Sequence, residues 1–191
     1  MIFIKVIFLF LILVLLSACA ANQEAIQQKV TPLAQELTKE QKPEVRGETM
    51  RLASNDFVEG GMIPRKFTCQ GDNINPHLAW ETVPEETKSF ALIVDDPDAP
   101  MGTWVHWLVK DIPADVREIQ EGEIQGNQVK NDFGKENYGG PCPPSGTHRY
   151  YFRLFALDTA NLSASNKKDF YKQAEQHTIG KVELMGKYKK N

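Results

Sequence analysis

The stretch FALIVDDPDAPMGTWVHWLVKDIP, residues 90–113, holds two apolar runs on either side of a turn rich in aspartate and proline. The runs at residues 90–94 and 103–112 contain many β-branched and aromatic residues, which indicates strands. Proline cannot continue a strand ladder, and aspartate side chains bond nearby backbone amides, so DDPDAP predicts a turn. We therefore expect two neighbouring strands whose connection carries three carboxylates.

The second of these strands carries a histidine. Alternation of side chains along a strand places Trp104, His106 and Leu108 on one face. A histidine between two large apolar side chains is expected to be buried, and a buried imidazole needs a hydrogen-bond partner. Asp96 and Asp98 follow the first strand, so we expect one of these carboxylates to be that partner.

A second polar cluster lies in YGGPCPPSGTHRYYFRLFAL, residues 138–157. Gly139 and Gly140 expose backbone amides without a side chain in the way, which is a geometry suited to anions. His148 and Tyr150 stand two residues apart at the start of a predicted strand, so their side chains share a face. An imidazole and a hydroxyl converge there. Taken alone, however, the segment is more typical of two ordinary strand-edge residues.

The remaining segments are short and extended, except at the C-terminus. Strands are expected at residues 51–57, 128–130 and 150–157, and helices at residues 166–176 and 181–188. Gly180 lies between the two predicted helices and can end the first. We therefore expect a mostly β domain over residues 50–191 with small C-terminal helices.

The N-terminus has the layout of an export signal. Residues 6–16 form an unbroken run of eleven apolar residues, which fits the core of a secretory signal and is short for a membrane span. The run leads to Leu-Ser-Ala-Cys, and the thiol of Cys19 can accept a lipid, so residues 1–18 resemble a bacterial lipoprotein signal. An ordinary signal cut near residues 18–21, or an uncleaved anchor, is the alternative. Residues 19–49 are polar and are expected to be a flexible tether.

This layout predicts a location and bears on the other cysteines. We expect a lipid-anchored membrane protein of the bacterial cell envelope that faces the periplasm or the exterior. With Cys19 lipidated, Cys69 and Cys142 remain as a pair in a compartment where disulfides persist. A disulfide between them would close a loop of more than 70 residues. Two buried free thiols are equally compatible with the sequence.

The charge composition excludes one class of partner. The chain has 22 basic and 25 acidic residues, a formal net charge of −3. A nucleic-acid-binding domain carries a basic surface, because phosphate contacts supply most of the affinity. We therefore expect no nucleic-acid partner.

Several separated motifs together are similar to a known family. They are Asp96-Pro97-Asp98-Ala99-Pro100, His106-Trp107, Gly139-Gly140-Pro141-Cys142-Pro143-Pro144, Gly146-Thr147-His148-Arg149-Tyr150, and GMIPRKFTCQGDNINPHLAW at residues 61–80. In this order they resemble the phosphatidylethanolamine-binding protein (PEBP) family, in particular its bacterial branch of Raf-kinase-inhibitor-like proteins. The resemblance covers about residues 56–188, and an ordered set of motifs is far more specific than any one of them.

The resemblance implies a fold and a site. The fold is an antiparallel, Greek-key β-sandwich with small helices, and the site is a shallow pocket for phosphate, phosphorylethanolamine or a similar anion. Carried over by position, its residues are Asp96, Asp98, His106, Gly140, His148 and Tyr150. Glycine amides, His148 and Tyr150 would donate to the anion. The aspartates would hold both histidines in donor tautomers or accept from an ammonium group of the ligand.

Three functions follow from these residues. The first is a membrane-tethered, non-enzymatic binding protein without a cofactor, whose ligand is a small anion or a phospholipid head group. The second is a metal-binding protein, because the carboxylates and imidazoles are transition-metal ligand types, although no metal-binding spacing joins them. The third is an interaction module that recognises an anionic group on a partner protein and inhibits an envelope protease.

A hydrolase is the least favoured function. Ser145 lies in Pro-Ser-Gly and not in the G-x-S-x-G turn that exposes a nucleophilic serine. Cys142 has neither a helix N-terminus nor an adjacent cation to activate its thiol. We therefore expect no catalytic residues.

Overall fold

The structure of the chain, a computed structural model, describes residues 49–190. The predicted signal at residues 1–18, the lipidation of Cys19 and nearly all of the predicted tether lie outside these residues. The described part contains two antiparallel β-sheets, a short 3-10 helix and one α-helix, which confirms the mostly β class. None of the helical segments in this part has the length and apolar character to cross a membrane.

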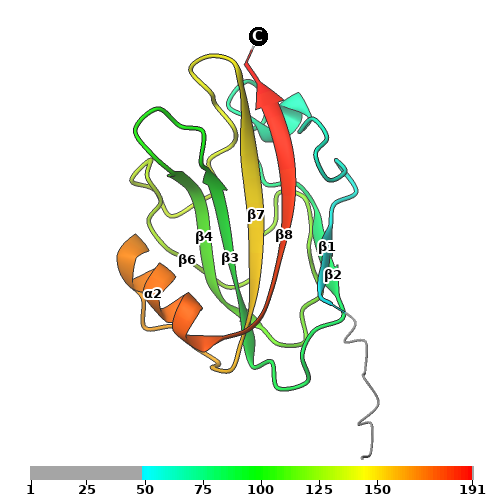
Figure 1. Cartoon of the computed structure of the whole chain (residues 1–191), viewed down its shortest axis with the longest axis vertical. Helices are drawn as coiled ribbons and strands as arrows, with labels where there is room; N and C mark the ends of the chain where they lie inside the picture. Colours follow the sequence, from blue (N-terminus) through cyan, green and yellow to red (C-terminus); the bar gives the residue numbers. More distant parts are fainter. Residues whose placement is uncertain (1–48, 191) are drawn as a thin grey trace, which may run out of the picture. The chain divides into compact units, whose positions relative to one another are not determined.

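The two sheets differ in size (Figure 1). In the described residues the large sheet has the order β6-β4-β3-β7-β8 and the small sheet the order β1-β2-β5. The bounds are β1 Arg51–Ala53, β2 Leu78–Glu81, β3 Ser89–Asp96, β4 Trp104–Pro113, β5 Glu118–Ile119, β6 Asn127–Gln128, β7 Thr147–Leu157, β8 Thr178–Lys189, η1 Arg65–Phe67 and α2 Lys167–His177. The strands predicted from the apolar runs are therefore present, and β1 and β6 are shorter than expected.

Strand β3 lies in the middle of the large sheet, and each of its residues is buried. One face of the sheet packs against the small sheet, where Leu92 and Val94 join Trp80 in one hydrophobic core. The opposite face packs against α2, where Ile93 joins Phe170 in a second core. A strand covered on both faces needs an unbroken apolar run, which is what FALIV supplies.

A β-bulge in β4 alters the predicted alternation. Val94 pairs with Trp107 and Asp95 pairs with Val105, so His106 is an extra residue on β4. As a result Leu108 packs in the core on the α2 side, whereas the ring of His106 contacts the ring of Tyr150, which belongs to the core on the small-sheet side. The prediction that His106 and Leu108 share a face is therefore wrong.

The C-terminal segment is a strand and not the helix predicted at residues 181–188. Strand β8 pairs with β7 along its length, from Lys189 opposite Thr147 to Thr178 opposite Leu157. Its alternate residues Leu184, Gly186 and Tyr188 are buried, which is the period of a strand. The long antiparallel partner outweighs the helical composition of the segment.

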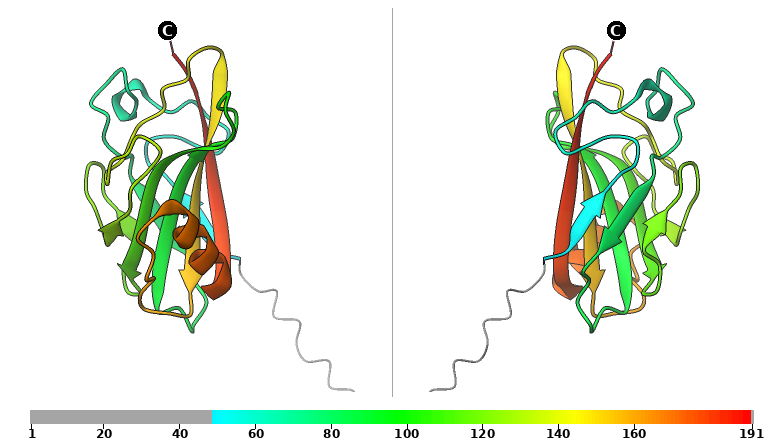
Figure 2. Two further views of the ribbon diagram at one scale, coloured as in Figure 1. Left: turned by 90° about the vertical axis from the view of Figure 1, so that its left-hand side faces the viewer. Right: turned by 90° about the vertical axis from the view of Figure 1, so that its right-hand side faces the viewer.

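The other C-terminal helix is confirmed as α2. The side chain of Asn166 accepts a hydrogen bond from the amide of Asp169 at 3.0 Å and so caps the helix. Phe170 and Ala174, four residues apart, are fully buried against the sheet. The side views show α2 confined to one end of the domain, while β8 follows the long axis (Figure 2).

Cys69 and Cys142 form a disulfide with a Cα–Cα distance of 5.4 Å. Beside it, the amide of Cys69 donates to the carbonyl of Pro141 at 3.1 Å. The bridge joins the segment after η1 to the segment before β7. Of the two alternatives for these cysteines, the structure therefore has the disulfide.

Reduction of this disulfide should lower the free energy of unfolding by about 4 kcal/mol in the chain-entropy model. The physical reason is that the bridge joins residues 73 positions apart and so restricts the unfolded chain. Urea unfolding with and without a reductant measures the change. A Cys69→Ser/Cys142→Ser variant is the control, because its free energy of unfolding should be the same with and without the reductant. Equal stability of the wild type in both conditions would contradict the prediction.

Candidate functional site

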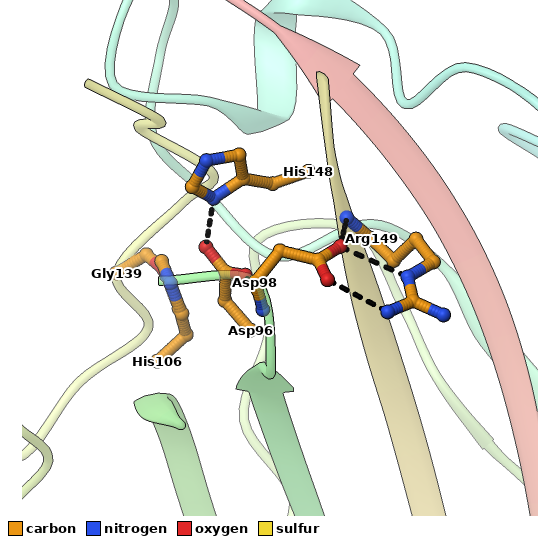
Figure 3. Close-up of polar contacts among 6 residues, drawn as sticks. All are labelled: Asp96, Asp98, His106, Gly139, His148 and Arg149. Carbon is orange, nitrogen blue, oxygen red and sulfur yellow. Dashed lines mark hydrogen bonds and ion pairs between the residues drawn. The ribbon is translucent and has the colours of Figure 1, made fainter. Parts of the chain in front are cut away.

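Four of the predicted site residues meet at one end of the large sheet. Figure 3 shows Asp96, His106 and His148 among them. Asp96 ends β3, His106 lies in the bulge of β4, and His148 and Tyr150 lie at the start of β7. Strands β3 and β7 are antiparallel neighbours, so the end of one meets the beginning of the other. All four side chains are buried, with exposed fractions of 7% or less.

Asp96 and His148 form a buried hydrogen-bonded pair. The Nδ1 atom of His148 lies 2.8 Å from Oδ2 of Asp96. A carboxylate accepts, so Nδ1 carries the proton and Nε2 is the ring nitrogen left for a ligand. The other oxygen of Asp96 accepts from the amide of Asp98 at 2.9 Å, which fixes the turn. The predicted support of a histidine by an aspartate is therefore present for His148.

His106 has a different partner from the one predicted. Its Nδ1 donates to the carbonyl of Gly139 at 2.6 Å, and the amide of Gly139 donates back to the carbonyl of His106 at 3.0 Å. The prediction that Asp96 or Asp98 bonds to His106 is wrong, because the bulge places the ring beside the glycine segment. Burial lowers the pKa of His106, although the Gly139 carbonyl and the charge of Asp96 oppose this. A neutral ring with a protonated Nδ1 leaves Nε2 as an acceptor.

Tyr150 presents an unpaired polar group. Its side chain is fully buried, and its hydroxyl has no hydrogen-bond partner among the described residues. Burial raises the pKa of Tyr150, and the nearby Asp96 carboxylate adds to this although it makes no well-formed hydrogen bond with the hydroxyl, so the hydroxyl remains protonated. Its ring lies against both histidines, with centroids 5.2 Å from His106 and 6.5 Å from His148. A buried hydroxyl without a partner costs about 1–3 kcal/mol, which makes this group a candidate for ligand contact.

Asp98 binds an arginine and not a histidine. Its carboxylate accepts from Nε of Arg149 at 2.9 Å, from Nη2 at 2.7 Å and from the Arg149 amide at 2.9 Å. The hydrogen bonds from Arg149 lower the pKa of Asp98 to about 2. The predicted role of Asp98 in holding a histidine is therefore wrong, and the pair ties the β3–β4 turn to the start of β7. Sequence reasoning missed Arg149, although it directly follows His148.

The glycine amides are not free to bind an anion. The Gly139 amide bonds to His106, as described above, and the Gly140 amide donates to Oδ1 of Asn73 at 2.7 Å. The predicted anion-binding role of these amides is therefore wrong. Glycine is needed here for close approach, because a Cβ on Gly140 would lie 2.4 Å from the carbonyl oxygen of Phe67.

Asn131 is a positioning residue that sequence reasoning missed. Its Nδ2 donates to the carbonyls of His106 and Asn137 at 2.9 and 2.8 Å. Its Oδ1 accepts from the amides of Phe133 and Lys135. This network holds the loop whose Phe133 ring packs edge-on to His106, with centroids 5.2 Å apart. No sequence motif marks Asn131 within its long polar segment.

A cavity of about 240 Å³ lies beside the cluster. Its lining residues are Cys69, Asn73, Phe133, Lys135, Asn137, Tyr138, Gly139, Gly140 and Cys142. Gly140 is the one predicted ligand-binding residue in this lining, so the four buried side chains lie next to the cavity and not in its wall. Within residues 49–190, no three His, Cys, Asp or Glu side chains are grouped as metal ligands. The geometry thus gives the metal-binding alternative no site in the described part.

Asp98 should contribute to stability in a pH-dependent way. Its folded pKa, about 2, is below the unfolded value of about 3.9, so the contribution is present above pH 4 and is lost as the pH falls toward 2. Asp98→Asn should therefore be less stable than the wild type at pH 7, and the difference should shrink between pH 4 and pH 3. Urea unfolding at each pH measures it, with the exposed Asp115→Asn as control. Parallel curves for wild type and Asp98→Asn would overturn this expectation.

Comparison with known proteins finds close relatives along most of the described part. UPF0098 proteins of Aquifex aeolicus and Methanothermobacter thermautotrophicus are each 44% identical, over 156 and 153 residues. These matches cover 76% and 74% of this chain and 91% and 99% of the relatives.

Solved structures agree with the sequence comparison. A PEBP homologue of Chlamydia trachomatis, CT736, has a TM-score of 0.71 and 40% identity, over 75% of this chain and 99% of its own. YbcL of Escherichia coli, described as a member of the mammalian PEBP family, has a TM-score of 0.70 and 33% identity, over 74% of this chain and 99% of its own. A family model for phosphatidylethanolamine-binding proteins matches residues 53–189. The chain therefore belongs to the phosphatidylethanolamine-binding protein family.

Proposed function

We propose that this PEBP-family binding protein takes a small zwitterion at the end of β3 and β7. The ligand carries a phosphate and an ammonium group, as phosphorylethanolamine does, either free or as a phospholipid head group. The observation that carries the proposal is the buried, unpartnered hydroxyl of Tyr150 beside the Asp96–His148 pair. The hydroxyl gains its missing partner when a ligand oxygen accepts from it.

The polarity of the cluster favours a zwitterion over a simple anion. The Tyr150 hydroxyl can donate to a phosphate oxygen, and the His148 ring, held by Asp96 through Nδ1, leaves Nε2 for the ligand. On the accepting side are the Asp96 carboxylate and Nε2 of neutral His106, and both suit an ammonium group. The guanidinium of Arg149 is already paired with Asp98. This guanidinium is therefore not free to bind the phosphate.

Binding fits the contacts better than hydrolysis does. The sulfur of Cys142 is in a disulfide and is not a thiol nucleophile. His148 is held by Asp96 and His106 by the Gly139 carbonyl, and within residues 49–190 neither ring is hydrogen-bonded to a serine. A nucleophile with an adjacent base is the minimum for covalent catalysis. We therefore retain a non-enzymatic role.

The location belongs to the same proposal. We infer that the protein is exported and held at the cell envelope by a lipid on Cys19, facing the periplasm or the exterior. The Cys69–Cys142 disulfide supports export, because such bonds persist in oxidising compartments. Labelled palmitate should be incorporated into the wild type and not into Cys19→Ala. Equal labelling of both proteins would contradict the lipid anchor on Cys19.

Tyr150→Phe should raise stability and lower ligand affinity at the same time. Removal of the unpaired hydroxyl should increase the free energy of unfolding by about 1 kcal/mol. Affinity for phosphorylethanolamine should fall about tenfold to a hundredfold, because a hydrogen bond to a charged group contributes about 1.5–3 kcal/mol. Calorimetric titration and urea unfolding of residues 19–191 with Cys19→Ser measure the two changes.

Tyr151→Phe is the matched control for this experiment. Tyr151 pairs with Asp95 on the neighbouring strand, and its ring lies 4.5 Å from the guanidinium of Arg153, away from the histidines. Its variant should bind phosphorylethanolamine as the wild type does. The proposed site is wrong if Tyr150→Phe binds with unchanged affinity, or if the wild type gives no saturable binding.

A further inference from the structure

A second and larger hollow lies on the opposite face of the large sheet. Its volume is about 660 Å³, within the range of small-molecule sites of about 300–1,000 Å³. The lining residues are Ile93, Asp95, Pro97, Thr103, Val105, Arg153, Phe155, Lys167, Lys168, Tyr171, Ala174, Glu175, Thr178 and Lys181. The lining residues belong to helix α2, to strands β3, β4, β7 and β8, and to the turn between β3 and β4. We call it the α2 groove.

The α2 groove is separated from the first site by the sheet itself. Asp95 lines the groove and Asp96 binds His148, and adjacent residues of a strand point to opposite faces. Val105 and His106 are divided in the same way, since Val105 packs on the α2 side and His106 contacts Tyr150. The first site and the α2 groove therefore share strands β3 and β4 but use different side chains of them.

The floor of the α2 groove is apolar. Ile93, Val105 and Phe155 are all lining residues and belong to the core on the α2 side, with exposed fractions of 0%, 2% and 5%. An apolar floor with a few polar groups at its margin is the usual make-up of a site for a small organic ligand.

The charged groups at the base of the groove are already ion-paired. Asp95 is 4% exposed, and its carboxylate accepts from Nε and Nη2 of Arg153 at 3.1 and 3.2 Å. The hydroxyl of Tyr171 lies 3.5 Å from the same carboxylate. Arg153 also pairs with Glu183, and Lys167 pairs with Asp132. In these ion pairs three carboxylates, Asp95, Glu183 and Asp132, share two cations, Arg153 and Lys167.

Two lysines at the margin remain available. Lys168 and Lys181 are exposed lining residues, and neither takes part in an ion pair within residues 49–190. The ammonium group of Lys181 lies 5.2 Å from the centre of the Phe155 ring, so it stands directly above the apolar floor. The lining as a whole has four cationic and two anionic side chains, on a chain whose net charge is −3.

We propose that the α2 groove is a second binding site, which takes an amphipathic anion with an acyl chain. The chain lies on Ile93, Val105 and Phe155, and the anionic head meets Lys168 and Lys181. Charge complementarity selects the sign of the head, because the carboxylates at the base are already ion-paired, and the rest of the lining has two cations, Lys168 and Lys181, against the one carboxylate of Glu175. A free fatty acid and a single-chain phosphate ester share this chemistry.

The test uses probes that differ only in their head groups. Dodecanoate, dodecyl phosphate and dodecyltrimethylammonium are titrated by calorimetry, below their micelle concentrations, into residues 19–191 with Cys19→Ser. Both anions should bind saturably, and the cation should not. The anion that binds more tightly shows whether the site prefers a carboxylate or a phosphate head group. Absence of saturable anion binding, or equal binding of the cation, overturns the proposal.

Three variants locate the binding. Lys168→Glu/Lys181→Glu should weaken dodecanoate binding by about tenfold or more, because both head-group contacts become repulsive. Lys172→Glu, on the same helix but outside the groove lining, should bind as the wild type does. Thr103→Trp places a large ring at an exposed lining position and should block binding. Wild-type affinity in the double variant and in Thr103→Trp would contradict the assignment.

Binding in the α2 groove should not depend on the first site. Lys168→Glu/Lys181→Glu should leave phosphorylethanolamine binding unchanged, because these lysines lie on the other face of the sheet from His148. In the same way Tyr150→Phe should leave dodecanoate binding unchanged. Failure of one site is thus distinguishable from failure of the other.

Discussion

The position of β3 between β4 and β7 is the constraint on which the rest of the structure depends. Because both neighbours are antiparallel to β3, its C-terminal end meets the start of β4 and the start of β7. That end therefore brings Asp96, His106 and His148 together, although they are far apart in sequence. The same strand divides consecutive residues between two faces, so Asp95 serves the α2 groove while Asp96 serves the first site.

Most polar groups described in the first site are hydrogen-bonded within the protein, but the buried hydroxyl of Tyr150 is not. The carboxylates of Asp96 and Asp98 and the amides of Gly139 and Gly140 are all hydrogen-bonded inside the protein. These contacts fix both histidine rings through Nδ1, and Nε2 of each ring is the nitrogen left for a ligand. The unpaired Tyr150 hydroxyl lies against both rings and is a local cost in stability. Such a cost at the centre of a rigid polar cluster is typical of a binding site.

Sequence reasoning predicted the features that depend on strand period and missed those that depend on tertiary pairing. Strands β3, β4 and β7 and the shared face of His148 and Tyr150 follow from apolar runs and from the period of two. The composition of residues 181–188 predicts a helix, but these residues form part of strand β8 because pairing with β7 outweighs local composition. The bulge at His106 and the bonds of Arg149 and Asn131 depend on loops whose paths no local pattern records.

The most direct measurement is the nitrogen-15 chemical shift of the histidine ring atoms during titration with phosphorylethanolamine. The chain has four histidines, and His77 and His177 lie away from the cluster and serve as internal references. We expect the Nε2 signals of His106 and His148 to shift saturably. Their Nδ1 signals should change little, because these atoms are already bonded to the Gly139 carbonyl and to Asp96. Saturable binding that leaves both Nε2 signals unmoved would place the ligand elsewhere and contradict the proposed site.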